Sequence, residues 1–458
     1  MAQPTSESLL FKAGFSKVCI SPPVGAALAG FAARENASVG VHDDLYARAL
    51  VLENEDAAVA FVCVDVLALP SEFVNKVRNA IHVSTGLEPH SIMIASTHTH
   101  AGPVTITTFF NPNESVDQSY LGRLAADIVE SVSTAWTNRF NARIGVGAGQ
   151  VKGVGVNRRS PDQRPVDEEV GIIKIADGEG ATRAVLINYA CHPTVLGPDN
   201  LLVTGDFPNF ALEAIEKALG PGSFAAFANG TQGNISMGHS SELSAIGVVT
   251  PGRTFERAAE LGNLLGAATL QALPVIEARA EVKLGADNLH VDLPLKKYPP
   301  LEETARLLRE AENRLAQLMA HDGHDIEEVR RAKSEQLYAS IANFYAQEAS
   351  ALTDGLLRIE LQAIRINDAV FVAVPAEVFV EIGLSLKESA PHRTFIVGLA
   401  NGYIGYLPTA AAHDVGGYEV VSSKCQPEAE EILINKVIRL EDHLFNDAGR
   451  TYQVSEKS

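Results

Sequence analysis

Short apolar runs recur along the whole chain, and few polar residues interrupt them. The runs are rich in Val, Ile, Ala and Phe, a composition typical of strands that are covered on both faces. Such runs predict strands at 57–69, 91–97, 143–149, 170–175, 183–192, 224–230, 364–377 and 394–403.

Between these runs, apolar residues return at helical spacing. One segment places Phe73, Val77 and Ile81 on a single stripe and stops at Gly86. On this basis helices are predicted over 71–86, 206–220 and 253–273. Strands that alternate with helices indicate a layered α/β fold with a largely mixed or parallel sheet and flanking helices.

Residues 300–353 have a different pattern, because they are charged and helical with a break at "HDGHD" (321–325). We predict two helices that form a hairpin inserted into a single domain spanning residues 1–458. A solvated helical arm is the simplest interpretation of so many charges, and a lid or a dimer-forming arm is the alternative.

Composition narrows the classes of partner. The 458 residues carry a formal charge of -19, which opposes binding to nucleic acids and stable association with anionic membranes. The four cysteines form no CxxC pair, and neither a secretory signal nor an apolar run of membrane-spanning length is evident. We therefore expect a cytoplasmic protein that acts on a small molecule, and a homo-oligomer stays open.

Side chains that bind metals stand repeatedly at the ends of the predicted strands. In open α/β sheets, loops at the carboxyl ends of strands converge on a crevice where sites form. Two histidines and a carboxylate with a fourth position open describe a catalytic zinc site, although no HExxH signature is present. The strand-end residues are His98, His100, His192, Glu377, Tyr403 and Tyr406.

Several blocks of the sequence resemble, in order, the signature blocks of the neutral/alkaline non-lysosomal ceramidase family. The opening segment and "VGVNRRSP" also match, so the resemblance extends over roughly residues 12 to 425. The blocks are "STHTHAGP", "NYACHPTVLGPDNLLVTGDFPNFALE", "NGTQGNIS", "VAVPAEVF" and "GLANGYIGYLPTAAAHDVGGYE".

This resemblance implies a zinc ion at the bottom of a cleft and hydrolysis of an amide bond. It implies that the zinc ligands are His98, His192, Glu377 and Tyr406. His100 resembles a histidine that does not bind the metal and contacts the substrate.

The resemblance also implies active-site roles for Arg158, Ser236 and Tyr418, with two departures from the family pattern. "GNISMG" replaces "GDVSPN", which leaves Ser236 open as a nucleophile, a partner of the zinc-bound water or a structural residue. "NRRSP" contains an extra arginine, so Arg158 and Arg159 compete for one place. Because the resemblance stops near the chain end, we expect a short member of bacterial type without the C-terminal domain.

The predicted function is zinc-dependent hydrolysis of the C–N bond in a small or medium N-acyl compound or a cyclic amide. His100 is suited to carry the proton, since imidazole titrates near neutral pH. Arg158, Tyr418 or backbone N–H groups can stabilise the oxyanion. The alternatives are an esterase or lactonase that keeps the zinc, and a non-catalytic binding domain.

Two aspartates near these blocks have more than one interpretation. Asp206 can orient His192 as a hydrogen-bond acceptor or cap the helix that follows it. Asp65 can likewise support the site or be a turn residue.

Overall fold

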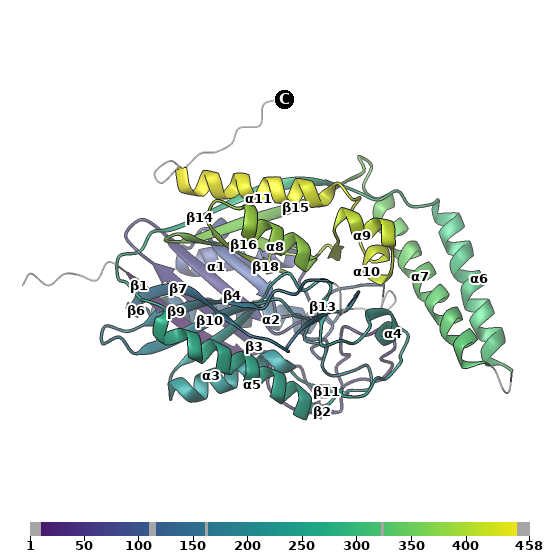
Figure 1. Cartoon of the computed structure of the whole chain (residues 1–458), viewed down its shortest axis with the longest axis horizontal. Coiled ribbons are helices and arrows are strands. Elements are labelled where there is room, and N and C mark those ends of the chain that lie inside the picture. The colour runs from purple at the N-terminus through teal and green to yellow at the C-terminus, as the bar shows by residue number, and fades with distance from the viewer. Residues whose placement is uncertain (1–10, 110–115, 161–163, 322–324, 447–458) are drawn as a thin grey trace, which may run out of the picture.

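The computed structural model describes residues 11–109, 116–160, 164–321 and 325–446. Within these residues, three sheets of four or five strands dominate the fold, and helices cover their outer faces (Figure 1). Each of the three sheets contains both parallel and antiparallel pairs, which confirms the predicted mixed α/β class.

The first sheet has the strand order β5–β4–β3–β1–β6. Strands β4 and β5 are parallel, whereas β3 runs antiparallel to both β1 and β4. Helices α1 and α2 pack on one face through an apolar cluster. The elements are β1 (Lys12–Cys19), β3 (Tyr46–Glu53), β4 (Ala58–Val64), β5 (Ile92–Ser96), β6 (Phe140–Asn141), α1 (Ser71–Thr85) and α2 (Gln118–Thr137).

The second sheet has the order β12–β10–β9–β7, and its parallel pair is β10 with β12. Helices α3 and α5 pack on each other and on this sheet. The elements are β7 (Arg143–Gln150), β9 (Glu169–Ala176), β10 (Thr182–Tyr189), β12 (Phe224–Asn229), α3 (Phe207–Leu219) and α5 (Phe255–Ala272).

The third sheet has the order β14–β15–β16–β18, and its parallel pair is β16 with β18. Helices α8 and α11 contact this sheet. The elements are β14 (Leu284–Pro294), β15 (Leu356–Ile366), β16 (Ala369–Val374), β18 (Arg393–Gly398), α8 (Val380–Ser389) and α11 (Ala429–Asn446).

One apolar cluster joins residues from all three sheets. At its centre, the ring of Phe371 lies 5.0 Å from that of Phe395 and 5.5 Å from that of Phe61, measured between centroids. Burying one such side chain stabilises the fold by about 1.5–3 kcal/mol, so this cluster holds the sheets to one another.

The carboxyl ends of the parallel pairs meet on one side of this core. Ser96, at the end of β5, donates its N–H to the Leu399 carbonyl just after β18, at 3.1 Å. Asn229, at the end of β12, donates from Nδ2 to the Thr97 carbonyl, also at 3.1 Å. Segments distant in sequence are thereby joined where the strand-end side chains stand.

Most predicted elements are confirmed, and one strand prediction is wrong. The apolar run 364–377 is not one strand: it contains the end of β15, all of β16 and the start of β17 (Glu377–Val378). Asn367 has a φ of 58° and reverses the chain between antiparallel β15 and β16. Asn tolerates this left-handed conformation, so two polar residues suffice for a tight turn inside an otherwise apolar run.

The segment 300–353 contains helices α6 (Leu301–Met319) and α7 (Ile326–Ser350), inserted between the paired strands β14 and β15. In Figure 1 the two helices project at the right, away from the sheets. Helix α7 contacts the body through Tyr338, which donates to Glu242, and Tyr345, which donates to the Ser422 carbonyl. The "HDGHD" break lies partly outside the described residues. No helix in the described part of the chain has the length and apolar content to cross a membrane.

Replacing Phe371 with alanine tests the shared core. We expect Phe371→Ala to lower the free energy of unfolding by about 3–5 kcal/mol, because the cavity lies where three sheets meet. Val275→Ala is the control, since Val275 is 82% exposed and its truncation should change stability by less than about 0.5 kcal/mol. Urea unfolding with equal midpoints for the two variants would contradict this account of the core.

Candidate metal centre and active site

His98 is held rigidly in the loop after β5. Its backbone has a φ of 73°, a conformation that costs a non-glycine residue about 1–3 kcal/mol and occurs preferentially at functional sites. Its Nδ1 lies 2.8 Å from the Leu67 carbonyl oxygen. A carbonyl can only accept, so Nδ1 carries the proton and Nε2 presents a lone pair.

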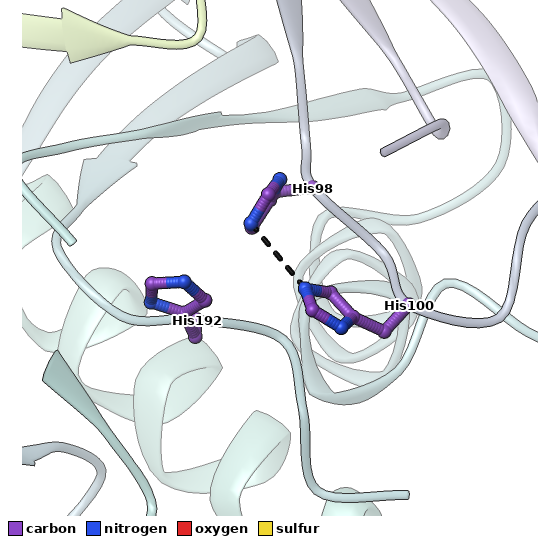
Figure 2. Close-up of side chains that lie close together, drawn as sticks. All are labelled: His98, His100 and His192. Atoms are coloured by element: carbon purple, nitrogen blue, oxygen red, sulfur yellow. Dashed lines mark hydrogen bonds between the residues drawn. The ribbon is translucent and has the colours of Figure 1, made fainter. Parts of the chain in front are cut away.

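His192, after β10, is fixed in the same way. Its Nδ1 lies 2.8 Å from the Gln232 carbonyl oxygen and 3.0 Å from that of Ile235. Its Nε2 is therefore also unprotonated in the neutral ring. Figure 2 shows the imidazoles of His98, His192 and His100 grouped around a common space.

Glu377 completes this group from β17, a short strand that follows β16 of the third sheet. Its Oε2 lies 2.9 Å from Nε2 of His192 and 3.4 Å from Nε2 of His98. Strand β17 pairs in parallel with β19 (Tyr406–Leu407), and this register sets Glu377 beside Tyr406. The Tyr406 hydroxyl lies 3.5 Å from Nε2 of His192. The structure thus brings together all four residues predicted to bind metal.

This cluster has the chemistry of a cation site. Two imidazole lone pairs and a carboxylate oxygen face one another, and none of the three atoms has a proton to donate in these states. His98, His192 and Glu377 are each about 2% exposed or less, so water cannot readily satisfy them. A divalent metal that accepts nitrogen and oxygen ligands fits this donor set, and zinc is the commonest such ion.

The charge states of two of these residues suit metal binding. Burial, with the charge of Arg158, lowers the pKa of His192 to about 4, so the ring is neutral at pH 7. Burial acts to raise the pKa of Glu377, but positive charge in this group outweighs burial and holds that pKa well below its usual range; protonated imidazoles, above all His98, would supply this charge, and a metal cation in their midst would act in the same direction. Neutral imidazole and ionised carboxylate are the forms that bind metals.

His100 faces the same space from the loop after His98. Its Nε2 lies 3.3 Å from Nε2 of His98, and its Nδ1 is buried without a hydrogen-bond partner among the residues that the structure describes. Phe31 packs edge-on against the ring at 5.0 Å. Gly30 has a φ of 102°, and a Cβ there would lie 2.5 Å from the His100 ring, so glycine makes room for the imidazole. The ligand atoms of the three histidines all lie within 4.8 Å of one another, so the non-ligand role of His100 stays a prediction.

The structure distinguishes the two competing arginines. Arg158 donates to the Tyr406 hydroxyl at 3.0 Å and to the Gly233 carbonyl at 2.8 Å. Arg159 instead donates to the Gly416 carbonyl at 2.7 Å. Arg158 is therefore the arginine that contacts the metal-binding group.

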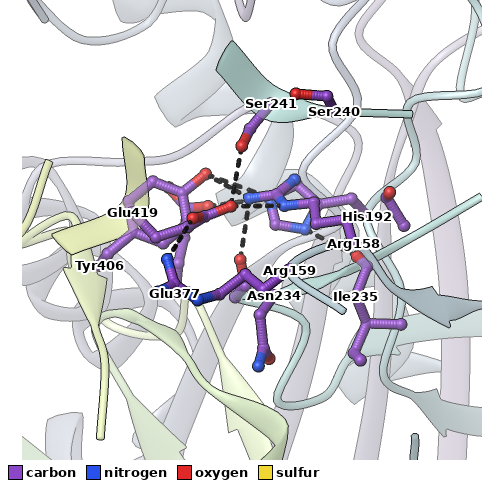
Figure 3. A network of polar contacts seen from close by, with 12 residues as sticks. Arg158, Arg159, His192, Asn234, Ile235, Ser240, Ser241, Glu377, Tyr406 and Glu419 are labelled. Atoms are coloured by element: carbon purple, nitrogen blue, oxygen red, sulfur yellow. Dashed lines mark hydrogen bonds and ion pairs between the residues drawn. The ribbon is translucent and has the colours of Figure 1, made fainter. Parts of the chain in front are cut away.

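Glu419 was missed by the sequence reasoning. It lies in the short helix α10 (Tyr418–Val421), and its carboxylate accepts from Arg158 at 2.8 Å, Arg159 at 2.9 Å and Ser241 at 2.8 Å (Figure 3). The only signal in the sequence was its place after Tyr418 at the end of a family-like block. The ring of Tyr418 packs edge-on against Tyr406 at 5.9 Å.

Ser236 contacts the backbone. It lies in β13 (Ile235–Ser236), and its hydroxyl donates to the His239 carbonyl at 3.2 Å. The preceding residue, Ile235, supplies one of the carbonyls that hold His192. Among the three alternatives for Ser236, these contacts favour the structural one.

The aspartates also have backbone roles. Asp206 accepts from the N–H of Phe207 and of Leu196, which confirms the helix cap and leaves His192 to the carbonyls described above. Asp65 accepts from the N–H of Tyr46 at 2.8 Å. The idea that Asp206 orients His192 is wrong, because Nδ1 of that histidine is already bonded elsewhere.

A cavity of about 190 Å³ is lined by residues that contact the histidines, although none of the three histidines is itself among its lining residues. Its lining includes Gly30 and Phe31, which back His100, and Leu67, whose carbonyl holds His98. Ile106 adds to the apolar wall, and Arg34 contributes a guanidinium that donates to the His100 carbonyl at 2.7 Å.

Comparison with known families agrees with this geometry. Residues 11–240 match the model of the neutral/alkaline non-lysosomal ceramidase N-terminal domain. The chain belongs to this family. A neutral ceramidase of Mycobacterium tuberculosis is 25% identical over 450 residues, covering 85% of this chain and 70% of that protein. A neutral ceramidase of Pseudomonas aeruginosa is 23% identical over 257 residues, and the alignment covers 38% of it.

Solved ceramidase structures have the same fold. The crystal structure of the neutral ceramidase from Pseudomonas aeruginosa matches 98% of this chain and 77% of its own, with a TM-score of 0.71 and 19% identity. A structure described as ceramidase complexed with C2 matches with a TM-score of 0.72, also at 19% identity. The match over residues 11–240 thus gives the family, and the solved structures give the fold.

Glu419 carries the clearest prediction for stability within this ceramidase-family site. Glu419→Ala leaves two buried guanidinium groups without their carboxylate, and we expect a loss of about 3–5 kcal/mol in unfolding free energy. The matched control is Glu260→Ala, which removes an exposed pair with Arg257 and should cost less than about 1 kcal/mol. Chemical denaturation measures the unfolding free energy of both variants. Equal decreases would contradict the expectation that the buried ion pairs of Glu419 stabilise the fold more than an exposed pair does.

Proposed function

We propose that this chain is a zinc-dependent hydrolase that cleaves the C–N bond of an N-acyl or cyclic amide. The observation that carries the proposal is the buried group of Nε2 of His98, Nε2 of His192 and Oε2 of Glu377, whose donor atoms fit a divalent cation. Family membership supports the amide bond, because the relatives are neutral ceramidases. Zinc as the metal rests on the ligand types.

His98, His192, Glu377 and Tyr406 would hold the zinc ion, which would supply a bound water with its pKa lowered to about 7 and a Lewis acid for a carbonyl oxygen. The protein supplies the orientation of the ligands: the Leu67 and Gln232 carbonyls keep both lone pairs directed at the centre. Such hydrogen bonds to ligating histidines also raise their basicity as ligands.

His100 is the residue we assign to proton transfer. Its Nε2 faces the centre, and burial holds its pKa well below 6.5. The neutral ring can accept a proton at Nε2 and release it to the leaving nitrogen. Proton transfer by a positioned side chain contributes about 10²–10⁴-fold to the rate.

Arg158 is the residue we assign to charge stabilisation. Its Nε and Nη2 are held by Glu419, Gly233 and Tyr406, while Nη1 has no partner among the described residues. A guanidinium fixed in this way can donate to a developing oxyanion without reorganising, which is worth about 2.7–4 kcal/mol for one donor.

We keep the small or medium substrate expected from the sequence as part of the proposal. The ester or lactone alternative keeps the same metal centre and differs only in the bond cleaved. A cytoplasmic location and the number of subunits stay predictions.

The direct test is to purify the protein, measure its metal and assay amides of graded size together with matched esters. We expect one zinc per chain, amide hydrolysis that a chelator abolishes and zinc restores, and faster turnover of short acyl groups than of long ones. Faster cleavage of esters would favour the alternative. Absence of stoichiometric metal would contradict the proposal.

Two histidine variants separate metal binding from proton transfer. We expect His192→Ala to lose zinc, because it removes a lone pair from the centre, and His100→Ala to retain zinc while losing at least about 100-fold in kcat. Metal analysis and kinetics on the same preparations measure both effects. Equal loss of zinc in both variants would show that His100 is also a ligand.

A further inference from the structure

The loop between β18 and β19 carries Tyr403, which the sequence places among the strand-end side chains and to which the family resemblance assigns no role. The Tyr403 hydroxyl donates to Oε1 of Glu377 at 2.7 Å. The other oxygen of that carboxylate, Oε2, faces His98 and His192. The two oxygens of Glu377 are thus divided between one proton donor and the metal-binding group.

Hydrogen bonds from both neighbouring sheets fix this loop in place. The Asn401 N–H donates to the Ile94 carbonyl at 2.8 Å, and the Asn401 side chain accepts from the Ile94 N–H at 3.0 Å. The same side chain donates to Gln362 at 2.8 Å. Asn401 has a φ of 64°, and such a conformation persists only where the surroundings over-determine it.

The residues next to Tyr403 are also constrained. The Ile404 N–H donates to the Pro375 carbonyl at 2.8 Å, which ties the loop to the segment that leads into Glu377. At Gly402, a Cβ would lie 2.1 Å from the Ser71 hydroxyl oxygen, so only glycine permits the close approach to α1. The hydroxyl of Tyr403 is therefore delivered to Oε1 by a rigid backbone.

The body of the Tyr403 ring packs against the apolar group formed by Ala29, Leu67, Ala68 and Ile106. Leu67 belongs to this group and also holds Nδ1 of His98 through its carbonyl. The segment that packs against the Tyr403 ring thus also holds His98.

We propose that Tyr403 is a positioning residue that fixes the Glu377 carboxylate so that Oε2 alone is presented to the metal. This inference rests on the metal centre of the proposed function. Without the hydroxyl, the carboxylate keeps its charge but loses the hydrogen bond at Oε1, its only described partner outside the metal-binding group. The carboxylate can then rotate, so that either oxygen can face the metal.

The test is zinc affinity, measured by competition with a chelator on the purified full-length chain. We expect Tyr403→Phe to weaken zinc binding by about 10–100-fold, the usual cost of losing a partner that orients a metal ligand. Tyr338→Phe is the matched control, because it also removes a tyrosine-to-carboxylate hydrogen bond. That bond joins Tyr338 of α7 to Glu242, away from Glu377. We expect the zinc affinity of that variant to equal that of the wild type.

A double-mutant cycle with Glu377→Gln identifies the route of the effect. If Tyr403 acts through the carboxylate, Tyr403→Phe weakens zinc binding much less in the Glu377→Gln background than in the wild type, because the carboxylate that Tyr403 orients is no longer present. Additive losses would overturn the inference and assign Tyr403 to general packing. Circular dichroism and unfolding midpoints of the metal-free variants verify that each one folds.

The outcomes separate this inference from the function on which it rests. A wild-type chain that binds zinc while Tyr403→Phe binds it equally well overturns the role of Tyr403 alone. A wild-type chain that binds no zinc overturns the metal centre and this inference together. Equal weakening in Tyr338→Phe also overturns the inference, because the effect would then not depend on Glu377.

Discussion

The site depends on one arrangement of acceptors: a single oxygen of Glu377 facing the unprotonated Nε2 atoms of His98 and His192. In a buried space, such an arrangement is unfavourable unless a cation occupies it. Each of the three groups is fixed from behind, the histidines by backbone carbonyls and the carboxylate by Tyr403. The rigid backbone around the site therefore holds three hydrogen-bond acceptors close to one another.

The fold makes this possible by joining three sheets around one apolar core. Each sheet contributes a parallel pair, and the ends of these pairs meet at the same side. His98 follows β5 of the first sheet, His192 follows β10 of the second, and Glu377 lies in β17, shortly after β16 of the third. Main-chain strain at His98, Leu399 and Asn401 is concentrated where these segments meet, and the stability of the surrounding core offsets it.

A second buried network surrounds the first and differs from it in charge. Arg158 and Arg159 share the carboxylate of Glu419, so this layer carries a net positive charge beside the acceptor-rich centre. Arg158 also donates to Tyr406, which connects the two layers. Arg159, the extra arginine of this chain, thus binds the same carboxylate that positions Arg158. The positive charge of Arg158 stays next to Tyr406.

The sequence by itself determined the class of fold, most of the strands and the residue types at the strand ends, because buried strands and helices have characteristic local patterns of apolar residues. Such local patterns do not say which distant residues contact one another. Only the tertiary structure decided three contacts. Arg158 and not Arg159 reaches Tyr406, Asp206 caps a helix, and Tyr403 holds Glu377. These contacts depend on where the backbones of distant segments cross, and His192 and Glu377, 185 residues apart, have no local pattern that relates them.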